Sequence, residues 1–356
     1  MVVRRYWGTA VILYKRYERP AFVVSMVAGF LVDFFTLSRV DLWLDNLVLL
    51  FYLMLAMTSI VLFNLREAGK LKKRWLNLVG TFAPLPMQYA FGGLFSGFLI
   101  FYWQSASIAA SWPFLLFLAC MLVGNEFFRE RYERLVFQIS ILFLAVFSYF
   151  VFSVPVLIKS MGPGVFIVSG VVSVLVTTTF LYLLSLWMPE RIRVSKSALS
   201  RSIIGIFAVM NILYFANVIP PIPLSLKEIG IYNMVSRQGG EYIRERIGEI
   251  PPWYKRLFSY EKLIVEEGDP AYVYTAVFAP TSLGADIIHH WQYFDAQKNV
   301  WTTVSRVEYQ IVGGRDGGYR GYSFYTNMQE GLWRVRVETE RGQMLGNAKF
   351  RVERPG

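Results

Sequence analysis

The stretch PLPMQYAFGGLFSGFLIFYWQSASIAA (84–110) is the segment that decides how this chain folds. It is mostly apolar and carries no charge, and it exceeds the about 20 apolar residues that a helix needs to cross a bilayer. Gly93 and Gly97 form a small-xxx-small step within it, which lets a second helix approach closely. We therefore predict a membrane bundle of helices packed around spans of this kind.

The composition of the 356-residue chain favours the same class. Hydrophobic residues make up 55% of the chain and aromatic residues 17%, which is more than a soluble globular protein usually holds. The net charge of +11 is unevenly placed, because residues 219–356 hold 17 basic and 16 acidic residues whereas residues 1–218 hold 19 and 9. The basic excess therefore lies between apolar segments, where it sets membrane orientation, and we expect no nucleic-acid partner.

Seven segments are apolar and long enough to be predicted as transmembrane helices: 20–37, 42–63, 84–103, 107–125, 135–158, 164–187 and 202–219. Every second connecting segment is basic. The segments 1–19, 64–83, 126–134 and 188–201 hold 17 Lys and Arg residues, against 2 in the intervening ones. The positive-inside rule then places the N-terminus in the cytoplasm and the chain after residue 219 outside it. The lipid bilayer is the first partner that the sequence predicts.

The C-terminal part of the chain has a different pattern. Residues 220–260 are predicted to be a linker in which 226–236 and 240–248 form short interfacial helices. From residue 261 to 356, apolar and polar residues alternate between glycine-rich turns, which is typical of a small all-β Ig-like sandwich. The expected strands are 262–266, 271–279, 286–294, 299–304, 306–312, 319–326, 332–339 and 345–353. The predicted fold class is thus an all-α membrane bundle at 1–219 followed by this sandwich.

An ordered set of Gly, Arg and Trp positions in the C-terminal part resembles a known bacterial family. The set is His289-x-Trp291, Gly313-Gly314-Arg315, Gly318-Tyr319-Arg320, Tyr322-Ser323, Gly331-x-Trp333-Arg334-Val335, Gly342-Gln343, Leu345-Gly346 and Phe350-x-Val352. It is similar to domain-of-unknown-function family 2914 over about 284–353, and the stretch 91–107 is similar to the polytopic part of such proteins. The resemblance implies a bacterial membrane protein, supports the domain boundary and assigns no chemistry. Together with the orientation from the charge count, it leads us to expect the cytoplasmic (inner) membrane as the location and a periplasmic or extracytoplasmic position for the C-terminal domain.

The glycine-rich segment 312–325 is the best candidate for a ligand site in the water-facing domain. Glycines let the backbone approach a ligand, the arginine forks suit carboxylate or phosphate, and the tyrosine rings suit a sugar. The alternative is a connection whose arginines pair with nearby acids. The candidate ligand-binding residues are Arg315, Arg320, Tyr319 and Tyr322, with His289 and Trp291 on a neighbouring strand.

The histidines and the cysteine do not suggest metal or cofactor chemistry. Cys120 is the only cysteine, and His289 and His290 are the only histidines. Neighbouring side chains of a strand point to opposite faces, so these two histidines cannot chelate one metal ion together. We expect His289 to be a hydrogen-bonded residue beside Trp291, with a proton switch as the alternative. We predict no metal and no cofactor.

Two function hypotheses remain open. The first is a non-enzymatic envelope protein whose sandwich binds a protein or a glycan, and homo-oligomers are compatible with it. The second is a membrane enzyme or transporter for a lipid-linked substrate, with a groove at the outer ends of the third and fourth spans lined by Gln88, Tyr102, Gln104 and Ser105. The Walker, GxSxG, HExxH and CxxC motifs are absent, which favours the first hypothesis.

Overall fold

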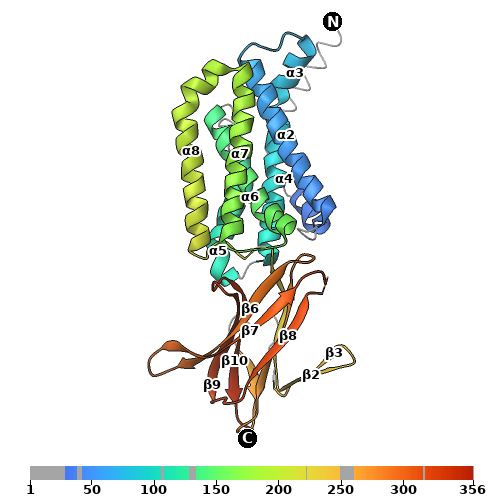
Figure 1. The fold of residues 1–356 in the computed structure, drawn as a ribbon, viewed down its shortest axis with the longest axis vertical. Coiled ribbons are helices and arrows are strands. Elements are labelled where there is room, and N and C mark those ends of the chain that lie inside the picture. Colours follow the sequence, from blue (N-terminus) through green and yellow to red (C-terminus); the bar gives the residue numbers. More distant parts are fainter. Residues whose placement is uncertain are drawn as a thin grey trace. The chain divides into compact units, whose positions relative to one another are not determined.

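The structure is a computed structural model that describes residues 29–37, 42–105, 108–127, 134–221, 223–248, 260–315 and 317–355. The chain divides into two compact units (Figure 1). The first comprises Met1–Phe101, Leu115–Phe150 and Ser169–Met210, and is helical where it is described. The second comprises Tyr102–Phe114, Val151–Val168 and Asn211–Gly356, so it joins several helix ends with all the described strands.

The N-terminal part is built from apolar helices. They are α2 (Trp43–Glu67), α3 (Arg74–Phe82), α4 (Pro84–Ser105), α5 (Ile108–Phe127), α6 (Leu135–Ile158), α7 (Pro163–Trp187) and α8 (Pro189–Phe215), and residues 29–36 are helical as well. Helices α4, α7 and α8 each begin at a proline, which suits a first helical position because its nitrogen has no intrahelical partner there. Helix α8 is followed by Asn217, whose left-handed backbone (φ 57°) ends the helical run.

Four of the described helices are long and apolar enough to cross a membrane, namely α2, α6, α7 and α8. The structure therefore does not support the predicted count of seven. The predicted span 84–103 is helical, but α4 interrupts its apolar residues with two prolines, three glycines and Gln88. In α5 the described apolar part is Ser111–Asn125, which is shorter than a span. Most of the predicted span 20–37 lies outside the described residues.

The glycine step of the opening stretch serves the close helix contact that the sequence predicted. A side-chain carbon built on Gly93 would lie 2.5 Å from the ring of Tyr52, and one on Gly97 would lie 2.8 Å from Leu49. Both partners belong to α2. Only glycine leaves room for α2 to pack against α4 at this distance, so the small-xxx-small prediction is confirmed.

Buried amides also link the helices of the first unit. Asn64 of α2 donates from its side chain to Gln138 Oε1 of α6 at 2.6 Å. Gln88 of α4 and Asn125 of α5 each donate to the backbone carbonyl of the other, at 3.3 and 2.9 Å. Polar groups surrounded by apolar side chains need such partners, so Gln88 joins α4 to α5.

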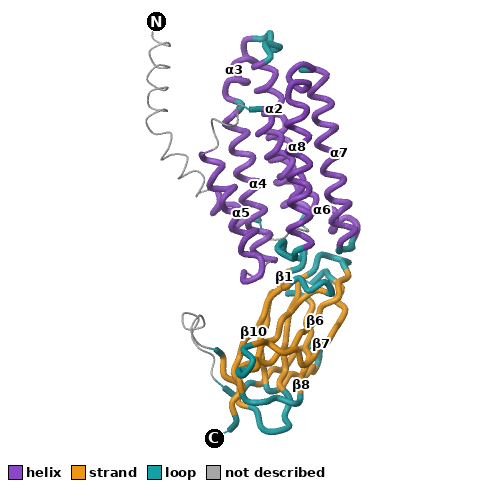
Figure 2. The backbone as a smooth tube through the Cα atoms, turned by 90° about the vertical axis from the view of Figure 1, so that its left-hand side faces the viewer, coloured by secondary structure: helices purple, strands orange, loops and turns teal. Residues whose placement is uncertain are grey.

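The C-terminal part consists of strands β1 (Ser225–Tyr232), β2 (Met234–Gln238), β3 (Glu241–Glu245), β4 (Glu261–Ile264), β5 (Ala271–Phe278), β6 (Gly284–Asp295), β7 (Val300–Val312), β8 (Tyr319–Tyr325), β9 (Gly331–Thr339) and β10 (Met344–Glu353). One sheet has the order β1-β5-β8 and the other β4-β10-β9-β6-β7. Strands β2 and β3 form a hairpin (Figure 1). Figure 2 draws the strands in orange and the helices in purple. All pairs are antiparallel except the parallel pair of β4 and β10.

The two larger sheets share one apolar core. The three-stranded sheet contributes Ile231 and Val273, and the five-stranded sheet contributes Trp291, Trp333 and Phe350, all of them buried. Alternation along each strand places every second residue in this core and its neighbours on the outside. The predicted strand GLWRVRVET (331–339) follows this rule, since Trp333, Val335 and Val337 are buried.

Two sequence predictions in this region were wrong. The segments 226–236 and 240–248 hold strands β1 to β3 and not short helices, because β1 pairs with β5 along its length and β2 pairs with β3. The expected strands 299–304 and 306–312 form a single strand, β7. A shift of register opposite Trp291 and Gln292 accommodates one extra residue there, which is a β-bulge.

Candidate functional site

His289 and Trp291 lie inside the β region and not on a ligand-accessible surface, since both side chains are fully buried. His289 Nδ1 lies 2.9 Å from Ser323 Oγ, and its Nε2 lies 2.9 Å from Thr275 Oγ1. The indole nitrogen of Trp291 donates to the same Ser323 Oγ at 3.0 Å. These bonds tie β6 to the two strands β5 and β8 of the opposite sheet.

The surroundings of His289 keep its ring neutral. Burial lowers the pKa of His289 from its ordinary 6.5 to about 3, because the charged ring would lose its hydration. The hydroxyl of Tyr309 lies 3.2 Å from Nε2 and 2.7 Å from Thr275 Oγ1, so it completes a closed set of partners. The geometry thus places His289 in a hydrogen-bonded core network, as the sequence led us to expect.

Arg315 and Tyr319 lie beside each other but apart from the other predicted residues of their segment. The guanidinium carbon of Arg315 lies 5.6 Å from the centre of the Tyr319 ring. Tyr319 is opposite Val277 in the sheet and packs against a cluster of buried apolar side chains. Its ring therefore supports the core, whereas Arg315 is exposed.

Arg320 and Tyr322 are the two predicted residues that the structure brings onto one exposed surface. They alternate with Gly321 and Ser323 along β8, and Ser323 points into the core. Arg320 and Tyr322 are therefore on the outer face of the three-stranded sheet, and Tyr322 is 40% exposed. This face is the candidate functional site.

We call this surface the aromatic face, and it gathers six aromatic side chains: Tyr232 of β1, Tyr242 of β3, Tyr272 and Tyr274 of β5, and Tyr322 and Phe324 of β8. The strand register explains the gathering. Tyr272 is opposite both Tyr232 and Phe324, and Tyr274 is opposite Tyr322, so rings meet across neighbouring strands.

The rings of the aromatic face contact one another. The centre of the Tyr272 ring lies 5.5 Å from that of Phe324 and 6.1 Å from that of Tyr322. The β2–β3 hairpin adds Tyr242, whose ring lies 5.4 Å from that of Tyr274. The hydroxyl of Tyr242 donates to the Arg320 carbonyl at 3.0 Å, which fixes the hairpin against β8. Phe324 remains 52% exposed.

Charged groups surround these rings. Arg244 of β3 forms an ion pair with Glu228 of β1, and its guanidinium lies 4.6 Å from the centre of the Tyr274 ring. Arg237 lies 5.9 Å from the ring of Tyr242. Such contacts between guanidinium groups and aromatic faces are favourable, and they hold the exposed side chains in defined positions. The face can thus offer ring surfaces, hydroxyls and guanidinium donors to one ligand.

The sequence analysis missed Tyr232, Tyr242, Tyr272, Tyr274, Arg244 and Phe324 as members of this face. One signal was present in the sequence, because Tyr272 and Tyr274 alternate in the same way as Tyr322 and Phe324. Aromatic residues two apart on a strand share a face. The pair Tyr272 and Tyr274 meets the pair Tyr322 and Phe324 through the register of β5 against β8. This register cannot be predicted from the local sequence pattern.

The predicted membrane residues that the structure describes are buried. Gln88 is held by Asn125, and the ring of Tyr102 lies between Phe114 and Phe152, at 4.6 and 4.7 Å between ring centres. Neither side chain is exposed. Gln104 and Ser105 belong to the last turn of α4, and their side chains lie outside the described residues.

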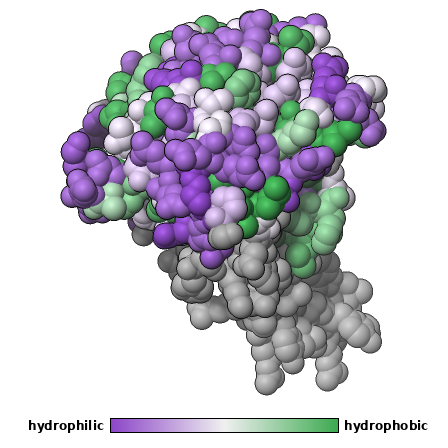
Figure 3. All heavy atoms as spheres, turned by 90° about the horizontal axis from the view of Figure 1, so that it is seen from below, coloured by the Kyte–Doolittle hydropathy of each residue, from purple (hydrophilic) through white to green (hydrophobic). Residues whose placement is uncertain are grey.

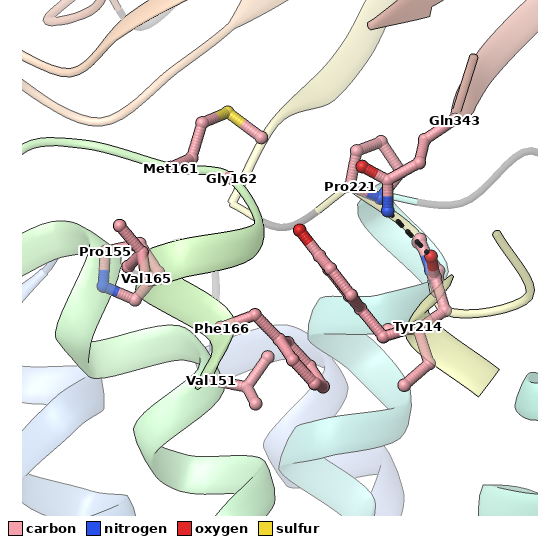
Figure 4. Close-up of a pocket in the computed structure, with 11 residues that line it drawn as sticks. Val151, Pro155, Met161, Gly162, Val165, Phe166, Tyr214, Pro221 and Gln343 are labelled. Atoms are coloured by element: carbon pink, nitrogen blue, oxygen red, sulfur yellow. Dashed lines mark hydrogen bonds between the residues drawn. The ribbon is translucent and has the colours of Figure 1, made fainter. Parts of the chain in front are cut away.

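A small pocket of the second unit has about 340 Å³ of empty space, part of it open to solvent (Figure 4). Its lining is apolar apart from Tyr214 and Gln343, whose amide donates to the Ile219 carbonyl at 3.3 Å. The rings of Phe166 and Tyr214, which line it, stack with their centres 3.8 Å apart. No charged side chain lines the pocket, so the described residues give it no group to recognise an ionic ligand. Among these residues we also find no cluster suited to a metal ion.

Comparison with known proteins adds a family for part of the chain. Residues 284–352 match the family described as "Protein of unknown function (DUF2914)". This confirms the resemblance predicted from the Gly, Arg and Trp positions. The matched part begins with β6 and ends within β10, so it includes the candidate residues of β8 but not the hairpin that carries Tyr242.

Other comparisons are uninformative about function. No curated protein matches the sequence. A solved structure of Pseudomonas fluorescens alkylpurine DNA glycosylase AlkC, bound to DNA containing an abasic site analogue, aligns over 89% of this chain and 99% of its own. The identity is 8% and the TM-score 0.24, values at which neither fold nor function carries over.

Proposed function

We propose that this chain is a membrane-anchored binding protein whose Ig-like sandwich presents the aromatic face to a protein of the bacterial cell envelope. The aromatic face carries the proposal. Exposed apolar surface is unfavourable in water, and exposed rings that gather on one face of a domain mark an interaction site. Tyr322 and Phe324, on the edge strand β8, are 40% and 52% exposed, whereas Tyr274 of the central strand is buried behind them.

The composition of the face favours a protein partner. Tyrosine and arginine are the side chains most enriched where protein interfaces gain their energy, because they bring large contact area together with hydrogen-bonding groups. The aromatic face combines six rings with Arg237, Arg244 and Arg320. A glycan is the second candidate, since the exposed ring of Tyr322 also suits stacking on a sugar.

The charge pattern supports an extracytoplasmic position for the β region, at the cytoplasmic (inner) membrane, and the support does not depend on the total number of spans. Helix α8 begins beside the basic residues Arg191, Arg193 and Lys196, and it leads into β1. The connection between α6 and α7, by contrast, holds only Lys159. By the positive-inside rule, α8 begins at the cytoplasmic surface, so the strands that follow it lie on the opposite side.

The alternative of an enzyme or transporter acting on a lipid-linked substrate has no comparable support. It requires an open groove, and the described side chains assigned to that groove, Gln88 and Tyr102, are buried. Self-association of the chain remains compatible with the proposal, because a second copy is one form that a protein partner can take.

Photo-crosslinking in intact cells tests this proposal. A photo-reactive amino acid replaces Phe324, and a control carries it at Glu267, an exposed residue of the turn between β4 and β5. We expect one dominant protein adduct from position 324 that is absent from position 267. The substitution Tyr322→Ala should reduce its yield at least tenfold, because truncation of a central aromatic side chain removes much of the binding energy.

Each other outcome has a defined meaning. A glycan adduct at position 324 would replace the protein partner by the second candidate. Lipid adducts alone, or the same adducts from positions 324 and 267, would refute the aromatic face as a binding site.

A further inference from the structure

The outer face of the five-stranded sheet has a different chemistry from the aromatic face. Side chains alternate between the two faces of a strand, so the neighbours of a buried residue point outward. The buried residues that fix the inner face here are Leu263, Trp333, Val335, Phe350 and Val352. Those outward residues include six cations, which we call the basic band: Arg306 of β7, Arg334 and Arg336 of β9, Lys349 and Arg351 of β10, and Lys262 of β4.

The strand register orders the basic band into three consecutive rows. Arg306 and Arg336 are both opposite His290 in the first row, Arg334 is opposite Lys349 in the second, and Arg351 is opposite Lys262 in the third. The carboxylates beside these rows are Glu308 and Glu338, in the row next to the first, and Glu353, which follows the third row and pairs with Lys262 at 3.0 Å. The charge is therefore concentrated and not spread evenly over the sheet.

A buried carboxylate positions the first row. Glu338 is 3% exposed, and its oxygens lie 3.0 Å from His290 Nδ1, 3.1 Å from Arg336 Nη2 and 3.7 Å from Arg306 Nη2. His290 Nε2 in turn lies 2.7 Å from the hydroxyl of Thr303. Arg306 nevertheless keeps 52% of its side chain exposed, so its guanidinium remains able to contact a ligand.

The second row is held by an amide and an indole. Arg334 Nε donates to Gln292 Oε1 at 2.5 Å, and its guanidinium lies 4.2 Å from the centre of the Trp301 ring. The rings of Trp301 and Phe294 are 5.2 Å apart at their centres, which continues the aromatic surface beside the cations. Lys349 and Arg351 are exposed on the neighbouring strand.

The dimensions of the basic band suit an extended chain. Five strands about 4.8 Å apart span roughly 19 Å, and three rows along the strands span roughly 13 Å. The long direction runs from Arg306 on β7 to Lys262 on β4. A ligand that follows it would meet charges in succession.

We propose that the basic band binds an anionic polysaccharide, a chain of acidic sugars. Charge complementarity favours a polyanion, because the six cations of the basic band outnumber the carboxylates of the adjoining rows, Glu308, Glu338 and Glu353, by two to one. The exposed Thr303 and the ring of Trp301 lie among the cations, and they match a ligand that carries hydroxyls and ring surfaces next to its acidic groups. An envelope protein fits less well, since a protein interface has an apolar centre.

Hydrophilic residues cover much of the face that Figure 3 shows, with hydrophobic residues in groups between them. The proposal is independent of the aromatic face, which belongs to the other sheet.

Binding of polygalacturonate oligomers to the full-length protein in nanodiscs of neutral lipid tests the proposal. The basic-band variant is the triple substitution Arg306→Gln, Lys349→Gln and Arg351→Gln. The matched control removes the same charge elsewhere, with Lys227→Gln, Arg237→Gln and Lys298→Gln. Neutral dextran serves as the ligand control, and vesicles containing phosphatidylglycerol serve as the competing anionic surface.

We expect the basic-band variant to bind polygalacturonate at least tenfold more weakly, and the charge-matched control to bind within twofold of the unmodified protein. The double substitution Tyr322→Ala and Phe324→Ala should leave this binding unchanged, which separates the proposal from the one made for the aromatic face. Equal weakening in both triple variants, no binding by the unmodified protein, or tighter binding to the vesicles would each overturn it. Thermal unfolding at the temperature of the unmodified protein shows that the basic-band variant keeps its fold. If the triple variant does not fold, the double variant Lys349→Gln with Arg351→Gln is used in its place.

Discussion

Replacing His289 by glutamine should make the β region markedly less sensitive to acid. In the folded chain burial holds the pKa of His289 at about 3, whereas the unfolded chain has the ordinary value of 6.5. The unfolded state therefore binds the proton first as the pH falls. The stability contributed by the neutral ring is fully present above pH 6.5 and is lost as the pH falls from 6.5 towards 3.

The size of this loss follows from the two pKa values. A pH of 4 is roughly 2.5 units below the pKa of the imidazole in the unfolded chain, so the unfolded chain is protonated there. His289 in the folded chain is still mostly neutral at this pH. At about 1.4 kcal/mol per unit, the free energy of unfolding falls by about 3 kcal/mol between pH 7 and pH 4 through this residue alone. Solvent does not weaken this effect, because the His289 side chain is fully buried.

The measurement uses the full-length protein in detergent, labelled with 5-fluorotryptophan. The ¹⁹F resonance of Trp333, assigned with a Trp333→Phe variant, reports the folded fraction of the β region during urea titrations at pH 7 and pH 4. His289→Gln should be less stable at pH 7, yet its loss between the two pH values should be smaller by about 3 kcal/mol. Ser323→Ala keeps the histidine and removes a partner, so it should be less stable with the pH dependence of the unmodified protein. Equal losses in His289→Gln and the unmodified protein would refute the assignment of a buried neutral ring.

Two further substitutions test the packing of the β region by the same urea titration. Gly313→Ala should lower the free energy of unfolding by at least about 2 kcal/mol, because its new carbon would lie 1.8 Å from the Pro280 carbonyl oxygen. Gly317→Ala in the same turn has free space around the new carbon and should change the stability little. Equal effects of the two substitutions would contradict this reading. Glu338→Gln should lower the free energy of unfolding by about 2 kcal/mol, because it removes the buried charge between Arg336 and His290. Substitution of the exposed Glu308 by Gln should change it by less than about 0.5 kcal/mol. An unchanged stability of the Glu338 variant would show that the carboxylate does not position these groups.

The strands that could be predicted from the sequence are those whose alternation is clean and whose partners follow at short intervals. In β9 the buried Trp333, Val335 and Val337 alternate with charged residues, Gly331 begins the strand and Gly342 lies in the turn after it. Strand β1 could not be predicted in this way. Its residues are mildly amphipathic at helical spacing, and they become a strand because Ser225 to Tyr232 pair with β5, far along the chain. Tertiary pairing outweighs local preference in such segments.

The candidate site shows the same division. Arg320 and Tyr322 were recognisable because they stand beside glycines in one short segment. The rest of the aromatic face comes from β1, β3 and β5, and its members meet only through strand register and through the hairpin contact between Tyr242 and Arg320. The predicted number of spans was wrong because the prediction of 84–103 relied on the length of the segment. The prolines, the glycines and Gln88 of α4 lower its apolar character below that of a span.

The two adjacent histidines show why the outer faces of the sheets, and not the core, are where function should be sought. His289 faces inward and is surrounded by neutral partners, so it stabilises the contact between the sheets. His290 faces outward and joins Glu338, whose charge orients the arginines of the basic band. The two sheets share one core, and packed sheets lie about 10 Å apart, so the aromatic face and the basic band point away from each other. The two proposals are therefore compatible with each other, because a protein bound to the aromatic face would leave the basic band accessible.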